Sequence, residues 1–196
     1  MKKICLTFDD GPHKVFTPII LDILKQYNIK ATFFIVGDRV SDNKDIIKRI
    51  IDEGHDIGNH SYNHECFSKM TDQDVFDSIN NTNNILNEYF NYTPKYVRAP
   101  YGRDFNDERI ISIFKKLNLV HILWDIDSRD WDKKNNYDAI IDNVLSKLSR
   151  TIMDKSIIIF HDCNSNYEEN ETMTIKALRK LIPILINEYQ FVKLHE

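Results

Sequence analysis

The chain has 196 residues, of which 42% are hydrophobic and 11% are aromatic. A chain of this size can bury a sizeable core, and no Pro/Gly/Ser-rich linker divides it, so we expect one domain over residues 1–196. Its 26 basic and 30 acidic residues give a net charge of −4, with no basic run that could neutralise phosphates. The composition favours a globular protein and argues against a nucleic-acid partner.

Cysteine usage and apolar segments limit the class further. Cys5, Cys66 and Cys163 match neither a fully paired disulfide framework nor a CxxC metal pattern. Charge appears at once at Lys2 and Lys3, and no segment reaches the roughly eighteen apolar residues of a membrane span. We expect no export signal, no membrane span and a monomer. Localisation stays open: cytoplasmic as written, or cell surface or secreted if the chain is a trimmed fragment.

Short apolar runs alternate with helical patterns along the chain. A strand is expected over residues 4–8, and the next helix is expected to begin at Thr17, as N-cap, and Pro18. A second strand, over residues 31–36, precedes a helix over residues 45–53 that Gly54 ends. The further strands are expected over residues 56–59, 96–98, 121–124, 156–160 and 191–194. The further helices are expected over residues 72–90, 107–117, 137–148 and 173–187.

This alternation predicts an α/β fold with a parallel sheet. Strands separated by helices of this length imply right-handed βαβ crossovers. Seven such units suit a closed or nearly closed barrel, and an open doubly wound sheet is the alternative.

Polar residues gather where the predicted strands end. Barrels of this class carry their chemistry on loops at the carboxyl ends of the strands. The residues that follow or close five of the strands are Asp9 and Asp10, His60 and His64, Arg98, Asp127 and Asp130, and His161 and Asp162. Each cluster alone could be a solvated loop, but together they predict one site on one rim.

The segment HSYNH, from His60 to His64, is the strongest local indication of a metal site. Histidines four residues apart lie on the same face of a helical turn, so both rings can bind one ion. A carboxylate from Asp10 would complete a set of two histidines and one acid, which leaves positions for water and substrate as in catalytic zinc sites. The same set suits non-haem iron(II), and a solvated helix start is the alternative.

Asp9 and Asp10 are adjacent carboxylates that repel each other unless a cation intervenes. If Asp10 binds a cation, Asp9 can remain charged beside it and take a proton from the attacking water. Adjacent side chains of a strand point to opposite faces, so both can reach one site only where the chain turns at Gly11 and Pro12. Periodicity leaves open which aspartate binds the ion, and a polar turn is the alternative.

Four further residues suggest parts of a catalytic site. His161, at the end of a buried strand, could be the acid for a leaving group, or a core-edge histidine bonded to a backbone carbonyl. Arg98 could hold Asp9 in a bidentate pair, or form a surface ion pair. Tyr101 and Trp131 could form walls for a sugar or acyl group, or simply pack.

The stretches TFDDG, HSYNH, RAPYG, DSRDW and IIFHD, in this order over residues 4–162, resemble the five motifs of the polysaccharide deacetylase family of carbohydrate esterases. These proteins share the chitooligosaccharide deacetylase homology domain. The resemblance implies a distorted (β/α)7-type barrel. It also implies hydrolysis of N-acetyl groups from amino sugars in a peptidoglycan- or chitin-like poly- or oligosaccharide, with release of acetate.

The resemblance further implies a cofactor and a base. Asp10, His60 and His64 would bind one divalent metal ion. Zinc is the first expectation, and cobalt, manganese, nickel and iron are the other candidates. Asp9 would be the general base, positioned by Arg98.

The remaining implied roles concern the acid and the substrate. His161 would be the general acid, and Asp130 would tune it. The backbone N–H of Tyr101 would help to hold the oxyanion, and Trp131 and Ile159 would line the acyl pocket.

Pro100 is also expected among the substrate-binding residues. Ile159 stands where the last motif usually has leucine, which is a volume-conserving change. The alternatives within hydrolases are an amidase acting on a small non-polymeric substrate and an O-acetyl esterase acting on a xylan-like polymer. A carbohydrate-binding module would be expected to have lost Asp9 or His161, and both are present. An iron(II) oxygenase would need an acidic ligand close to the first histidine and a co-substrate site, and neither is visible in the sequence.

Overall fold

The computed structural model describes residues 1–102, 106–163, 167–168 and 171–196. The α-helices are α1 (Phe16–Gln26), α2 (Lys44–Asp52), α3 (Asp72–Phe90), α4 (Glu108–Lys116), α5 (Tyr137–Arg150) and α6 (Met173–Leu185). The strands are β1 (Lys2–Gly11), β2 (Thr32–Ile35), β3 (Asp56–Asn59), β4 (Tyr96–Val97), β5 (Val120–His121), β6 (Ile126–Asp127), β7 (Lys155–His161), β8 (Tyr167–Glu168), β9 (Glu171–Thr172) and β10 (Tyr189–Phe191). Short 3-10 turns are η1 (Gly37–Arg39), η2 (Ser41–Asn43), η3 (Phe67–Lys69) and η4 (Pro100–Gly102).

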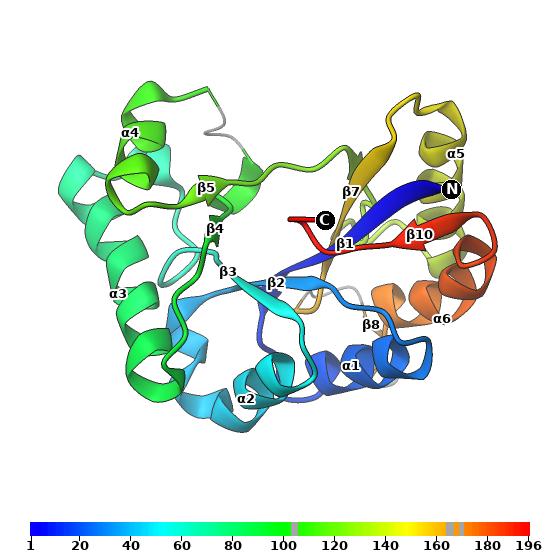
Figure 1. The fold of residues 1–196 in the computed structure, drawn as a ribbon, viewed down its shortest axis with the longest axis horizontal. Coiled ribbons are helices and arrows are strands. Elements are labelled where there is room, and N and C mark those ends of the chain that lie inside the picture. Colours follow the sequence, from blue (N-terminus) through cyan, green and yellow to red (C-terminus); the bar gives the residue numbers. More distant parts are fainter. Residues whose placement is uncertain (103–105, 164–166, 169–170) are drawn as a thin grey trace.

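The main sheet is parallel and curls into a half-barrel with the strand order β5-β4-β3-β2-β1-β7-β6 (Figure 1). Along one edge of β1, β10 pairs with residues 2–4 and β2 with residues 7–11, while β7 pairs along the other edge. The strands at the two ends of the sheet, β5 and β6, follow each other in sequence, so the segment between them joins the ends of the sheet. The predicted α/β barrel class is confirmed.

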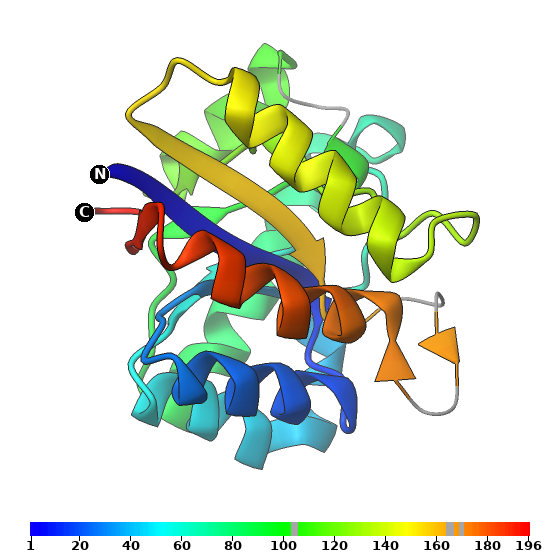
Figure 2. The same cartoon turned by 90° about the vertical axis from the view of Figure 1, so that its right-hand side faces the viewer.

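The core lies mainly between the sheet and its outer helices. Figure 2 shows α1, α6 and α5 side by side over one face of β1 and β7. Ile4, Leu6 and Phe8 of β1 belong to this core. Because side chains alternate along a strand, Thr7 and Asp9 point to the other face, into the curl of the sheet. A smaller core lies under α3 and α4.

Several sequence expectations were wrong in detail. Residues 121–124 do not form one strand: β5 and β6 are separate two-residue strands, each pairing with a single neighbour. The last strand, β10, is Tyr189–Phe191 and not residues 191–194, and the hairpin β8–β9 was not predicted. Thr17 is not the N-cap of α1, because Val15 holds that position. The Thr17 hydroxyl accepts a hydrogen bond from the His13 backbone N–H and donates one to the Asp162 carboxylate.

The six predicted helices are present with boundaries shifted by a few residues. As predicted, α2 ends just before Gly54, whose φ of +80° suits a glycine. Within the described ranges, none of these helices has the length and apolar character needed to cross a membrane.

Candidate active site

The carboxyl ends of the parallel strands form the rim that carries the site. Asp9 and His161 are direct register partners on β1 and β7. Contrary to expectation, β1 does not end before the two aspartates but continues to Gly11. The pairing with β2 shifts register between Phe8 and Gly11, and Asp10 has a φ of 72°. This bulge re-aims the Asp10 side chain, so both carboxylates reach one rim.

Asp10 lies beside the two histidines of HSYNH. Its Oδ1 is 3.3 Å from His60 Nε2 and 3.0 Å from His64 Nε2. The helical turn expected over residues 60–64 is absent; Ser61 and His64 have φ values of 68° and 59°. The Asn59 side chain accepts the Ser61 N–H and the Ser61 hydroxyl accepts the His64 N–H, which folds the segment into a tight loop.

The environment of these three residues fits a divalent cation. One potential ligand atom from each lies within 4.8 Å of the others. Asp10 Oδ1 is buried without a hydrogen-bond partner. His60 Nδ1 bonds to the Arg98 carbonyl at 2.8 Å, which turns Nε2 toward Asp10, an arrangement common for metal-binding histidines. Burial would raise the pKa of Asp10, but the two imidazoles outweigh it and hold that pKa below its ordinary value.

Asp9 is held differently from Asp10. The fully buried Arg98 guanidinium donates to Asp9 Oδ1 at 2.7 Å and to Thr7 Oγ1 at 2.9 Å, both through Nη1. The expected bidentate pair is therefore wrong, because the other Arg98 N–H groups donate to the carbonyls of Ile122 and Leu123, each at 3.1 Å. Burial lowers the pKa of Arg98, and the charge of Asp9 opposes that effect.

His161 is paired with a carboxylate and not with a backbone carbonyl. Its Nδ1 lies 2.7 Å from Asp130 Oδ1, and its backbone N–H donates to Asp130 Oδ2 at 2.8 Å. The Thr174 hydroxyl donates to the same Oδ2 at 2.6 Å. Burial by itself would lower the pKa of His161, but the Asp130 charge and hydrogen bond raise it to about 10. These contacts favour the protonated form of the His161 imidazole.

A cavity of about 420 Å³ brings these groups together. Its volume lies within the range of small-molecule sites. Its walls include Tyr101 and Trp131, which are 59% and 49% exposed, and the buried Ile159. Pro100 is buried and is not among the described residues that line the cavity, so its contact with substrate stays a prediction. Asp9, Asp10, His60, His64 and His161 all line it.

Some lining residues were missed by sequence reasoning. Trp124 and Gly102 both line the cavity, and a Cβ on Gly102 would lie 2.2 Å from the Trp124 ring. Gly102 and Tyr101 have φ values of 60° and 64°. The Gly after RAPY was a visible turn signal, but nothing in the sequence predicts that it packs against Trp124. The support that Thr174 gives to Asp130 also joins residues far apart in the chain.

Fold and geometry together define a curled parallel α/β barrel whose rim carries a candidate site for one metal ion. A family model described as polysaccharide deacetylase matches residues 1–122. The chain belongs to the polysaccharide deacetylase family, as its five motifs predicted.

Individual relatives agree with this assignment. The chain is 38% identical to a peptidoglycan-N-acetylglucosamine deacetylase of Bacillus cereus over 93% of its length, and 33% identical to the Listeria monocytogenes enzyme PgdA over 100%. It spans 63% and 38% of the lengths of those two proteins. A family 4 acetyl xylan esterase from Clostridium thermocellum, solved with a cobalt ion, superposes with a TM-score of 0.85 at 33% identity, covering 99% of this chain and 89% of that one.

Proposed function

We propose that this chain is a metal-dependent hydrolase that removes N-acetyl groups from amino sugars in a peptidoglycan- or chitin-like poly- or oligosaccharide and releases acetate. The observation that carries the proposal is the content of one cavity. It holds the Asp10–His60–His64 cluster together with Asp9 and His161. The names of the two bacterial relatives support an N-acetylated glycan as the substrate.

Asp10, His60 and His64 would hold one divalent cation, with zinc as the first candidate. When bound, such a cation supplies Lewis acidity and lowers the pKa of water. The similar esterase was solved with a cobalt ion, which supports a divalent cation as the cofactor but leaves the choice of metal open.

The protein's own side chains would move the protons. Asp9, oriented by Arg98, accepts a proton from the water that attacks the amide carbonyl. His161, held by Asp130, then donates a proton to the nitrogen as the carbon–nitrogen bond breaks, which yields acetate and a free amine. Asp9 and His161 suit opposite proton transfers. Asp9 contacts the Arg98 guanidinium and suits the role of proton acceptor, whereas His161 contacts the Asp130 carboxylate and suits the role of proton donor.

Three residues would serve the acyl group. The left-handed backbone at Tyr101 sets the direction of its N–H, which we assign to the oxyanion. Trp131 and Ile159 would line the pocket for the acetyl methyl. Ile159 is a β-branched residue on a buried strand, so it forms a stiff wall.

Two other substrates are the runners-up. The acetyl xylan esterase favours an O-acetylated polymer as one of them. The other is a small non-polymeric amide.

A parallel assay separates these candidates. The metal-loaded protein is given N-acetylated chitooligosaccharides, peptidoglycan, acetylxylan and a monomeric N-acetyl amino sugar, and acetate and free amine are measured together. The proposal predicts equal amounts of acetate and amine from one or both N-acetylated glycans. Acetate without amine from acetylxylan alone, or turnover of the monomer alone, would contradict it.

A further inference from the structure

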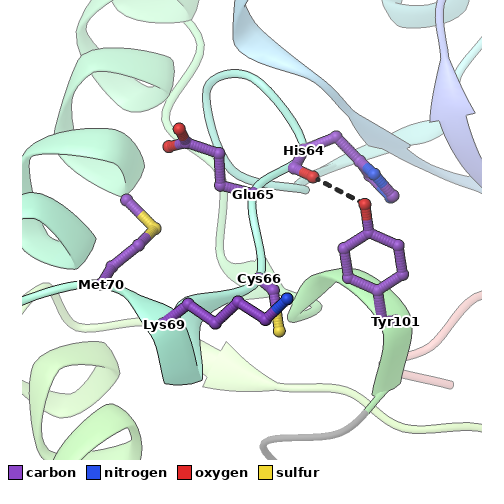
Figure 3. A pocket seen from close by; sticks show the side chains of 6 residues that line it. All are labelled: His64, Glu65, Cys66, Lys69, Met70 and Tyr101. Carbon is purple, nitrogen blue, oxygen red and sulfur yellow. Dashed lines mark hydrogen bonds between the residues drawn. The ribbon is translucent and has the colours of Figure 1, made fainter.

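A second cavity adjoins the catalytic one. It has a volume of about 570 Å³ and is lined by His64, Glu65, Cys66, Lys69, Met70 and Tyr101 (Figure 3). His64 and Tyr101 line both cavities. Their rings are 4.7 Å apart, and the Tyr101 hydroxyl donates to the His64 carbonyl. A substrate long enough to fill the catalytic cavity and pass this pair would enter the second one.

The wall that carries Lys69 is held by the fold. Phe67, the first residue of the turn η3, is fully buried in the core under α3 and α4. Arg109 of α4 donates to the carbonyls of Phe67 and Met70, at 3.2 and 3.1 Å. The backbone of this turn is therefore fixed, and the Lys69 side chain extends from it.

The ammonium of Lys69 is available for a ligand. Lys69 is exposed, and within the described ranges its ammonium has no hydrogen-bond or ion-pair partner. Figure 3 shows the Lys69 ammonium directed toward the side of the cavity where Tyr101 lies. The Glu65 carboxylate points away from the ammonium. The positive charge of Lys69 therefore lies on the wall of the second cavity, toward the Tyr101 that both cavities share, in a protein whose net charge is −4.

We propose that this cavity is a subsite for a carboxylate-bearing part of the glycan, next to the sugar that loses its acetyl group, and that Lys69 recognises the carboxylate. The inference rests on the proposed function and narrows its substrate. A lysine ammonium pairs with a carboxylate as a point charge with three donors. Met70 and the Tyr101 ring offer apolar surface for the carbon skeleton beside that charge.

The test compares matched substrates on matched variants. An N-acetylated oligosaccharide with one carboxylate on the neighbouring sugar is assayed against its methyl ester, and kcat and KM are measured for both. The wild type should prefer the free acid through KM. Lys69→Met should lower the acid-to-ester ratio of kcat/KM roughly threefold to fivefold, since a partly exposed ion pair is worth this much. Lys69→Glu should lower it further, and Lys69→Arg should retain it.

Lys95→Glu is the control variant. Lys95 is exposed just before β4, at the amino end of the sheet, and should leave the ratio unchanged although the net charge changes equally. Raising the salt concentration should reduce the wild-type preference and not that of Lys69→Met. An unchanged ratio in Lys69→Glu would overturn the inference. If the wild type released acetate from neither the acid nor the ester, that result would instead contradict the proposed function.

The carboxylate could belong to the sugar or to an attached peptide. One arm therefore uses a saccharide with a sugar-borne carboxylate and no peptide. The other uses a saccharide whose sugar carboxylate is amidated by a peptide that ends in a free carboxylate. The arm whose KM rises in Lys69→Met identifies the source, and a rise in neither would overturn the inference.

Discussion

Asp9 and Asp10 are neighbours in the chain, yet the fold gives their carboxylates different surroundings. Asp10 faces two imidazoles, whereas Asp9 Oδ1 accepts a hydrogen bond from a buried guanidinium. The sequence left open which aspartate binds a cation. The geometry supports Asp10 as the ligand and Asp9 as the base.

The first prediction separates the two aspartates. Asp10→Asn should lose metal and activity together, because it weakens a ligand. Asp9→Asn should keep the metal and lose activity by about a hundredfold or more, because it removes a general base. Metal content by elemental analysis, beside kcat, checks this. Equal metal loss in both variants would mean that both carboxylates bind the ion.

The second prediction concerns pH. The pKa of His161 is raised to about 10 from 6.5, so its protonated form persists through neutral pH and is lost as the pH rises toward 10. Asp130→Asn removes the charge that raises this pKa, so the alkaline limb of the kcat profile should move to lower pH, while the acidic limb moves little. The test compares the pH profiles of the wild type and Asp130→Asn, because coupled groups in one site give macroscopic pKa values that belong to no single residue. An alkaline limb that stays in place, with fold and metal content verified, would contradict the role of Asp130.

At the scale of elements, long periodic segments were predictable and short pieces were not. Periodic apolar residues predict the long helices α3, α5 and α6, and continuous apolar runs predict the strands β1 and β7. In contrast, β5 and β6 have two residues each and exist because a neighbouring strand pairs with them. The site was predictable as residue types at strand ends. The bulge at Asp10 was not, because it depends on the pairing with β2. The loop at His64 was not, because hydrogen bonds to the Asn59 and Ser61 side chains replace the helical turn.

The third prediction uses two glycines with similar backbones. Gly54 and Gly102 have φ values of +80° and +60°, but a Cβ on Gly54 would meet only the flexible end of Lys30, at 3.8 Å, whereas one on Gly102 would overlap the Trp124 ring. Gly54→Ala should cost about 1–2 kcal/mol of the free energy of unfolding, from the backbone alone. Gly102→Ala should lower the free energy of unfolding by about 1–3 kcal/mol more, because the added methyl group overpacks against Trp124, and it should raise KM. Urea unfolding and steady-state kinetics measure both; equal losses would show that Trp124 simply moves aside.

At the scale of the molecule, Arg98 links the site to the closure of the sheet. Its side chain joins Asp9 on β1 to the carbonyls of Ile122 and Leu123, in the segment between the end strands β5 and β6. One buried guanidinium thus holds the Asp9 carboxylate and fills the curl of the sheet where no strand pairing is present among the described residues.

The fourth prediction follows from this position. Arg98→Met should lower the free energy of unfolding by about 3–5 kcal/mol, because it leaves the Asp9 carboxylate buried without its partner. Arg179→Met, which removes a largely exposed pair with Glu171, should cost about 1 kcal/mol or less. Denaturant midpoints at constant m-value measure both variants. A small loss in Arg98→Met would show that Asp9 does not depend on the arginine.

The most direct test of metal-dependent deacetylation by this protein is to measure metal content and deacetylation on the same sample. Protein purified without chelator should hold about one equivalent of divalent metal, as a single three-residue site requires. Its release of acetate and amine from an N-acetylated glycan should stop when chelation removes the metal, and should return when zinc or cobalt is restored. Full activity in a sample verified to be metal-free would contradict a metal-dependent reaction.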